Sequence, residues 1–119
     1  MNVQIFGFHD CQDTRKALRF FAERRIVVHF VDLEERPMAK GELKRFGDRF
    51  GAACVDTNGA TYKALRLRVA LDSPQRLVER ALTEPRLLRT PLVRNAGKVT
   101  IGPLPDEWQA WIDAEKKPA

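Results

Sequence analysis

The sequence predicts an α/β fold with a mixed sheet, in which a helical segment separates a β-α-β half from a β-β-α half. Three observations predict this order. Strand-forming residues flank an amphipathic helix pattern within residues 1–33. A hairpin pattern followed by a last helix occupies residues 89–119. The residues between these segments, 34–88, carry helical patterns and turn signals.

The first segment has the pattern of a βαβ unit. Residues 3–8 alternate in hydrophobicity, and an apolar stripe over about residues 13–25 predicts a helix. Residues 26–33 are apolar almost throughout, so we expect a second strand that is buried on both faces. A strand, helix and strand at this spacing predict two parallel strands with a right-handed crossover.

The middle segment predicts three helices. The first covers about residues 38–50, where apolar residues recur with helical spacing. After a turn at Asn58-Gly59, a second helix is expected over about residues 62–70. The third begins at Ser73-Pro74, because Ser is a good N-cap and Pro a good first helical residue, and runs to about residue 82.

The last segment predicts a hairpin and a helix. Residues 91–94 and 98–101 are expected to pair across a tight turn at Ala96-Gly97. A helix follows, with Trp108 and Trp111 on one face. The whole order is thioredoxin-like: we expect a single domain, 1–119, with a core of about 1–33 and 89–119 and a helical insertion of about 34–88.

Composition argues against a membrane protein and leaves two interpretations of the positive charge. The 119 residues are 44% apolar and contain no apolar run of the roughly 18 residues that a membrane span requires. The N-terminus has no basic segment before an apolar one, so we expect a cytoplasmic protein with no membrane partner. The net charge of +5 fits either an arginine-rich solvated surface or an anion site. Charge alone does not support nucleic-acid binding, which we do not expect.

Cys11 is the candidate nucleophile. It lies where the first strand meets the first helix, so free backbone N–H groups and the helix dipole favour its thiolate. Arg15 and Lys16 add positive charge in the first turns. The alternative is an inert, buried cysteine. No metal is expected, because neither cysteine forms a ligand spacing with a histidine.

Residues 11–17, Cys-Gln-Asp-Thr-Arg-Lys-Ala, resemble the C-x-x-[C/S/T]-[R/K]-K-A signature of the arsenate reductase (ArsC) and Spx-like family. Similar segments follow at residues 56–59, at Pro91 with Leu92-Val93, and at Ile101-Gly102, so the resemblance spans nearly the whole chain. It implies a thioredoxin-like fold with a helical insertion. It also implies thiol oxidoreductase activity, with Cys11 as the nucleophile.

Position 14 is a second cysteine in dithiol members of the family, and here it is Thr14. The resemblance therefore implies a monothiol enzyme, in which Cys11 forms a mixed disulfide with glutathione or a glutaredoxin-type partner thiol. Glutathione would be a co-substrate, and no bound cofactor is expected. Thr14 is placed to hydrogen-bond the Cys11 sulfur; the alternative is an ordinary helix residue.

The family's arsenate-binding arginines are out of register. Their positions carry Thr90, Asp56 and approximately Gly102. We therefore expect arsenate to be reduced weakly or not at all, since an oxyanion beside a thiolate needs positive charge. The candidate substitutes are Arg15, Arg89 and Arg94, for which solvated surface arginines are the alternative.

Thr90-Pro91 corresponds to the proline that faces the active cysteine in thioredoxins and glutaredoxins. The resemblance implies a cis bond and a backbone site for glutathione or substrate; the alternative is a trans proline on an edge strand. Cys54 lies in an apolar run, which favours a buried core residue over a resolving thiol for Cys11. We interpret His9 as a solvent-facing loop residue rather than a thiolate partner, and His29 as structural.

Two other functions stay open. Spx-like relatives include regulators that contact RNA polymerase, but Thr14 removes the C-x-x-C redox switch of that branch. The chain could also be an inactive relative kept for another partner. Thiol reactivity distinguishes the enzyme from the inactive form.

Overall fold

The computed structural model describes residues 1–116 of the chain. Its contacts divide the chain into two compact units. The first contains residues 1–32 and the described residues from Thr90 onward, and the second is Leu33–Arg89. Within residues 1–116, no helix is both long enough and apolar enough to cross a membrane.

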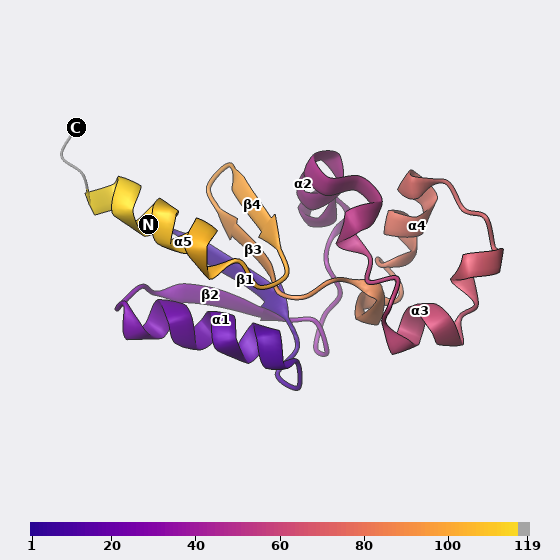
Figure 1. The fold of residues 1–119 in the computed structure, drawn as a ribbon, viewed down its shortest axis with the longest axis horizontal. Helices are drawn as coiled ribbons and strands as arrows, with labels where there is room; N and C mark the ends of the chain where they lie inside the picture. Colours follow the sequence, from indigo (N-terminus) through magenta and orange to yellow (C-terminus); the bar gives the residue numbers. More distant parts are fainter. Residues whose placement is uncertain (117–119) are drawn as a thin grey trace. The chain divides into compact units, whose positions relative to one another are not determined.

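A four-stranded mixed sheet forms the centre of the first unit (Figure 1). Its strands are β1 (Val3–Gly7), β2 (Val28–Asp32), β3 (Leu92–Asn95) and β4 (Lys98–Ile101), arranged in the order β2-β1-β3-β4. Strand β1 is parallel to β2 and antiparallel to β3, and β3 forms an antiparallel hairpin with β4. The predicted βαβ unit and terminal hairpin are thus confirmed.

Strand β2 differs from its prediction. It is an edge strand that pairs with β1, and of its five residues Val31 alone is buried. His29, expected to be structural inside the strand, is exposed. An apolar run indicates burial on both faces only where neighbouring strands and helices cover it, and sequence pattern does not fix the position of a strand in the sheet.

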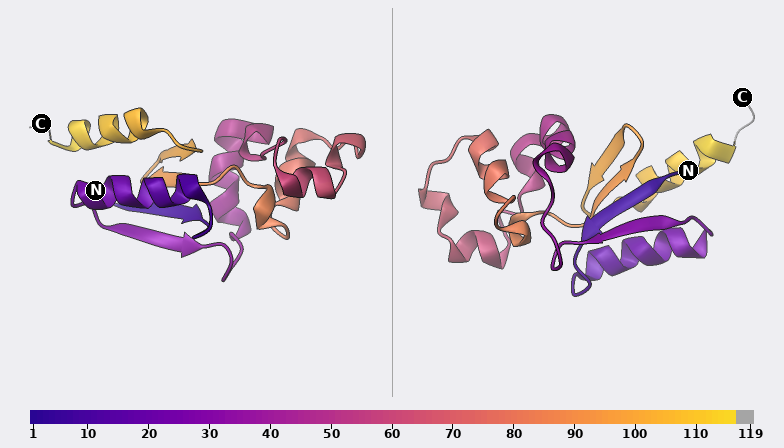
Figure 2. Two further views of the ribbon diagram at one scale, coloured as in Figure 1. Left: turned by 60° about the horizontal axis from the view of Figure 1, so that its bottom comes forward. Right: turned by 180° about the vertical axis from the view of Figure 1, so that it is seen from behind.

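Helices α1 (Gln12–Glu23) and α5 (Pro105–Lys116) share one core with the sheet (Figure 2). On the strands, Val3, Ile5 and Val93 contribute to it, because alternate residues of a strand point to the same face. Ala17 and Phe21 enter from α1, as the apolar stripe of that helix predicts. The core residues of α5 are Trp108, Trp111 and Ile112.

Trp108 fixes the last helix to the hairpin. Its side chain is 2% exposed, and its Nε1–H donates to Thr100 Oγ1 on β4 at 2.8 Å. Its ring also packs against Phe20 and Phe21 of α1, with both centroid distances at 5.5 Å. A buried indole N–H needs such a partner, so the two helices and β4 form one packed assembly.

The second unit is helical. Its elements are α2 (Lys40–Phe50), α3 (Ala60–Ala64), α4 (Pro74–Arg80) and the 3-10 turns η1 (Gly51–Cys54), η2 (Leu67–Val69) and η3 (Pro85–Leu87). Ser73 caps α4 by accepting from the backbone N–H of Arg76, as its sequence position predicts. The helix predicted over 62–70 is wrong in extent, because Arg66 adopts a left-handed conformation that separates α3 from η2.

Candidate active site

Cys11 is the N-cap residue of α1 and directly follows the loop that leaves β1. Its backbone N–H donates to the carbonyl of Phe8 at 3.1 Å, and its own carbonyl accepts from Arg15 N at 3.0 Å. Its side chain makes no capping hydrogen bond, and the residue is half-buried. The sulfur is therefore held at the positive end of a 12-residue helix while part of its surface faces solvent.

Thr90 approaches the sulfur from the loop before β3. Its hydroxyl donates to Cys11 Sγ at 3.2 Å, across 79 positions of sequence. The Thr90–Pro91 peptide bond is cis, as predicted, and Pro91 is buried. The sequence predicted a role for the backbone of Thr90 but not for its side chain. The resemblance compares this position with an arginine, so the prediction considered the missing charge and not the hydroxyl.

Thr14 lies beneath the sulfur, one turn into α1. Its side chain is 0% exposed, and Oγ1 has no hydrogen-bond partner of normal geometry among the described residues. Gly7 at the end of β1 makes room for it: a Cβ there would lie 2.5 Å from Thr14 Oγ1. Sequence reasoning missed this role of Gly7, although a glycine that ends a strand often marks a close approach.

The surroundings of Cys11 lower the pKa of its thiol. Burial opposes this change, because desolvation raises the pKa. Hydrogen bonding to the sulfur more than offsets burial, first from the hydroxyls of Thr14 and Thr90 and then from the backbone N–H groups of Thr14 and Asp13. The Thr14 hydroxyl acts at short range although its geometry is not that of a full hydrogen bond. The thiolate is thus favoured by neutral donors.

Arg15 and Lys16, the two cations expected beside Cys11, are both exposed. The guanidinium of Arg15 donates to the backbone carbonyl of His9 at 2.8 Å, so this arginine braces the loop before the helix. His9 is itself exposed, stacks on Phe30 and lies 3.6 Å from the Asp32 carboxylate, which agrees with its interpretation as a loop residue.

Arg94 does not belong to the site, and its candidate role is corrected. It pairs with Gln4 on β1, towards the end of β3 away from Pro91, and its Nε–H donates to the carbonyl of Ala96. It lies three positions after Pro91, roughly 10 Å along an extended strand. With His29 and Gln4 it borders a small polar cavity at that end of the sheet.

Arg89 is the last residue of the helical unit. Its backbone N–H donates to the Cys54 carbonyl at 2.7 Å and its Nε–H to the Ala53 carbonyl at 3.2 Å. Both bonds tie it to η1.

The Asp56 carboxylate also makes a local contact: it accepts from the backbone N–H of Asn58 at 3.1 Å in a tight turn.

Gly102 supports the cis-proline loop. Its backbone N–H donates to the carbonyl of Pro91 at 2.9 Å, and its φ of 70° favours glycine. Gly102, at approximately the position where the resemblance implies an anion-binding arginine in arsenate reductases, is thus a buried glycine that holds Pro91 in place.

Cys54 is a core residue, as favoured from the sequence. Its side chain is 0% exposed, and burial raises the pKa of its thiol to about 11. A thiol with this pKa is almost entirely protonated at neutral pH, and the thiolate is the nucleophile in disulfide exchange. Of the two cysteines, Cys11 is therefore the reactive one.

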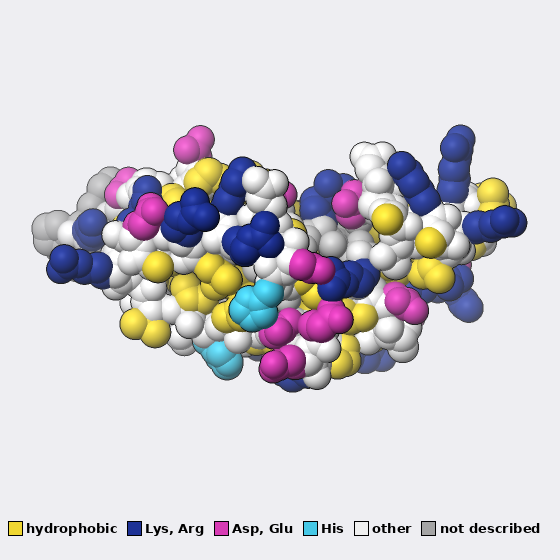
Figure 3. All heavy atoms as spheres, turned by 90° about the horizontal axis from the view of Figure 1, so that it is seen from below, with side chains coloured by type: hydrophobic (Ala, Val, Ile, Leu, Met, Phe, Trp, Pro, Cys, Tyr) yellow, Lys and Arg dark blue, Asp and Glu magenta, His cyan; other side chains and the backbone are white. Residues whose placement is uncertain are grey.

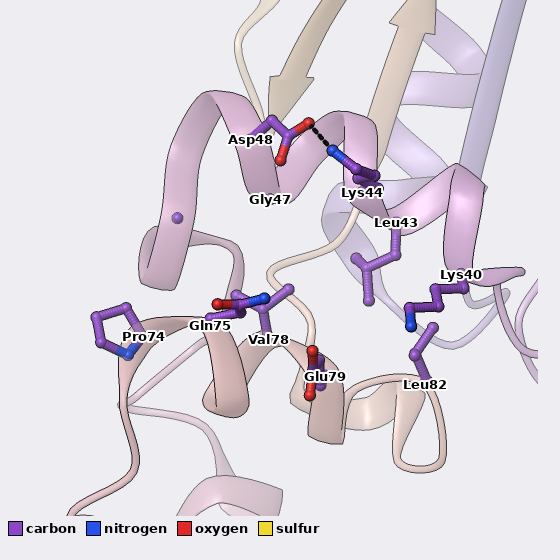
Figure 4. Close-up of a pocket in the computed structure, with 11 residues that line it drawn as sticks. Lys40, Leu43, Lys44, Gly47, Asp48, Pro74, Gln75, Val78, Glu79 and Leu82 are labelled. Atoms are coloured by element: carbon purple, nitrogen blue, oxygen red, sulfur yellow. Dashed lines mark hydrogen bonds and ion pairs between the residues drawn. The ribbon is translucent and has the colours of Figure 1, made fainter.

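The helical unit has a separate groove between α2 and α4, with a volume of about 440 Å³ (Figure 4). Leu43 and Val78 line it from the two helices, and Lys44 pairs with Asp48 at its rim at 2.7 Å. It contains none of the residues predicted for the site. On the surface, Lys and Arg side chains are spread over the face in Figure 3, with acidic side chains among them.

A model of the ArsC family matches residues 6–111, which includes Cys11, Thr14 and the Thr90–Pro91 loop. The chain belongs to the ArsC family. Its fold is that of the family's thioredoxin-like structures. This membership confirms the resemblance that the sequence motif carries.

Three known proteins are similar to this chain over most of its length. The uncharacterised protein YusI of Bacillus subtilis is 25% identical over 92% of this chain and 97% of its own. The global transcriptional regulator Spx 2 of Oceanobacillus iheyensis is 27% identical over 86% of this chain and 77% of its own. A solved structure, a putative arsenate reductase from Yersinia pestis, is 25% identical with a TM-score of 0.79, over 92% of this chain and 99% of its own.

Proposed function

We propose that this ArsC-family protein is a monothiol oxidoreductase linked to glutathione or a glutaredoxin-type thiol. The observation that carries the proposal is the half-buried Cys11 sulfur, which receives the Thr90 hydroxyl at 3.2 Å at the N-terminus of α1. A thiolate favoured at neutral pH and reachable from solvent is the requirement for attack on a disulfide.

The proposed reaction has two exchange steps. The Cys11 thiolate attacks one sulfur of a disulfide, a new S–S bond forms, and the other sulfur leaves as a thiolate. A glutathione thiolate then attacks the mixed disulfide and releases Cys11 as a thiolate. In this second step Cys11 is the leaving group, so the donors that favour its thiolate also favour its release.

Thr90 and Pro91 form the proposed substrate site. The loop lies beside the sulfur, which supports the proposal that its backbone pairs with a peptide-like ligand such as glutathione. The site offers hydroxyls and backbone groups, and the guanidinium of the neighbouring Arg15 donates to the His9 carbonyl. A neutral disulfide matches this chemistry better than an arsenate dianion does, because a dianion beside a thiolate requires positive charge.

Treatment with glutathione disulfide, followed by mass spectrometry, tests the proposal. We expect one glutathionyl group per chain on the wild type, none on Cys11→Ser and one on the matched control Cys54→Ser. A turnover assay with a glutathione mixed disulfide and with arsenate then compares the two substrates, and we expect turnover of the disulfide alone. Failure of Cys11 to accept glutathione would overturn the proposal, and robust turnover of arsenate would overturn the substrate class.

A second candidate function is favoured by the similarity to Spx 2 over 86% of the chain. A regulator of this kind would act by contacting RNA polymerase and would not need turnover. Co-purification of the tagged protein with RNA polymerase, compared with Cys11→Ser, separates the two functions. Polymerase binding by both forms, without glutathionylation of the wild type, would favour the regulator.

A further inference from the structure

We propose that Cys11 also reacts with hydroperoxides and that Thr14, Thr90 and the N-terminus of α1 hold the sulfenate that results. The inference rests on the proposed function, because both reactions use the same nucleophile. It adds a second class of oxidant, an organic hydroperoxide or hydrogen peroxide, to the disulfide.

The first observation is the hydroxyl of Thr14. It is fully buried beside the sulfur, and no acceptor or donor of normal geometry satisfies it among the described residues. Buried polar atoms without partners are rare, and one that faces a reactive group indicates a partner that arrives during the reaction. A sulfenate oxygen on Cys11 would bring a strong acceptor to this position.

The second observation is the set of donors around the sulfur. Thr90 Oγ1 donates from the β3 side at 3.2 Å, and the backbone groups of Asp13 and Thr14 in the first turn of α1 lower the pKa of the thiol. No side chain caps this end of α1. A helix N-terminus that no side chain caps is suited to an anion, and the added hydroxyls suit a singly charged oxygen.

The third observation is that no other thiol in the same unit can capture the sulfenate. Cys11 is half-buried, so a small hydroperoxide can reach it. Within residues 1–32 and 90–116 it is the single cysteine. The other cysteine, Cys54, is 0% exposed, and burial raises the pKa of its thiol to about 11. The oxidised sulfur therefore waits for a thiol from solution, and its lifetime depends on the groups that surround it.

The reaction balances without a further cofactor. The Cys11 thiolate attacks the outer oxygen of ROOH, the S–O bond forms, the O–O bond breaks, and ROH leaves with the proton. The sulfur is oxidised by two electrons and the peroxide is reduced by two. Glutathione thiol then attacks the sulfenate, which gives the Cys11–glutathione disulfide and hydroxide and joins the cycle proposed above.

The test oxidises the protein with hydrogen peroxide, removes the peroxide with catalase, and adds a cyclic 1,3-dione that labels sulfenates at increasing delays. Mass spectrometry then gives the lifetime of the sulfenate. The variants are Thr14→Val and Thr90→Val. Thr14→Ser and Thr90→Ser keep each hydroxyl, and Thr83→Val removes a hydroxyl that is bonded to Arg80 O in the other unit.

We expect one label per chain on Cys11 and a lifetime about tenfold shorter in each valine variant, since each loses a hydrogen bond to a charged group. Overoxidised cysteine should rise in parallel, while both serine variants and Thr83→Val keep the wild-type lifetime. Absence of label on the wild type, or unchanged lifetimes in both valine variants, would overturn the inference. The same samples are also treated with glutathione disulfide, a reaction that needs no sulfenate. Glutathionylation without a sulfenate label would contradict this inference alone and leave the proposed function standing.

Discussion

Thr90 occupies the position at which arsenate reductases carry an arginine, and its hydroxyl donates to the Cys11 sulfur at 3.2 Å. A neutral donor stabilises the thiolate but does not provide the charge that would bind an oxyanion. At the scale of single residues, the pKa of the Cys11 thiol is therefore lowered by two threonine hydroxyls and by backbone groups of the first turn of α1.

Replacement of Thr90 by Val removes the hydroxyl that donates to Cys11 Sγ at 3.2 Å. We expect the pKa of Cys11 to rise, and alkylation by iodoacetamide at neutral pH to slow by about threefold to tenfold. Thr90→Ser, which keeps the donor, is the matched control. Equal alkylation rates for Thr90→Val and the wild type would contradict the role given to this hydroxyl.

Gly7 gives a second prediction for a single residue. In Gly7→Ala the new Cβ would lie 2.5 Å from Thr14 Oγ1, so Thr14 and the start of α1 must shift. We expect a loss of about 1–3 kcal/mol in the free energy of unfolding, measured in urea. Gly41→Ala is the control, because nothing lies within 4 Å of its Cβ position in α2 and alanine favours helix. If the two variants are equally stable, the close approach is wrong.

At the scale of elements, the hydrogen bond between Trp108 and Thr100 joins α5 to β4. The helical spacing of Trp108, Trp111 and Ile112 predicts which face of α5 is buried, and the structure confirms it. The acceptor for the indole N–H could not be predicted, because it depends on which strand α5 covers.

Thr100→Val keeps the shape of this side chain and removes the acceptor. We expect it to cost about 1–3 kcal/mol of unfolding free energy, because the Trp108 N–H is left buried without a partner. The exposed control Thr83→Val should change the same quantity by less than about 0.5 kcal/mol. Urea unfolding with an unchanged slope measures both; a Thr100→Val midpoint equal to that of the wild type would refute the prediction.

Whether a segment forms a helix or a strand could be predicted from its local sequence pattern, but its surroundings in the fold could not. The period of two in residues 3–8 and the Ser73-Pro74 start of α4 depend on neighbouring residues, so both could be predicted. The edge position of β2 depends on sheet order, which involves residues from both ends of the chain. The left-handed turn at Arg66 has no glycine or proline to indicate it.

At the scale of the whole molecule, the chain places its two cysteines in different compact units and gives them opposite chemistry. Cys11 is half-buried with a lowered pKa, and Cys54 is fully buried with a raised one. The motif around Cys11 allowed its role to be predicted from the sequence. The Thr90 hydroxyl could not be predicted, because it reaches the sulfur across 79 positions.

The opposite pKa shifts of Cys11 and Cys54 predict the number of reactive thiols. At pH 8 the native protein should react with one equivalent of a thiol reagent, and the unfolded protein with two, because Cys54 ionises only near pH 11 while it is buried. Mild oxidation should accordingly leave Cys54 reduced. Rapid formation of a Cys11–Cys54 disulfide would contradict this prediction and revive a two-cysteine redox switch.

The central claim is that the site lowers the pKa of the Cys11 thiol, and the pH dependence of its alkylation in Cys54→Ser tests it most directly. Because its pKa is lowered in the folded state, reactivity should be complete at mildly alkaline pH and be lost as the pH falls through the folded-state pKa. The account predicts a midpoint below the value of about 8.5 for a free cysteine, and a return towards that value on unfolding. A midpoint in the native protein at or above about 8.5 would contradict it.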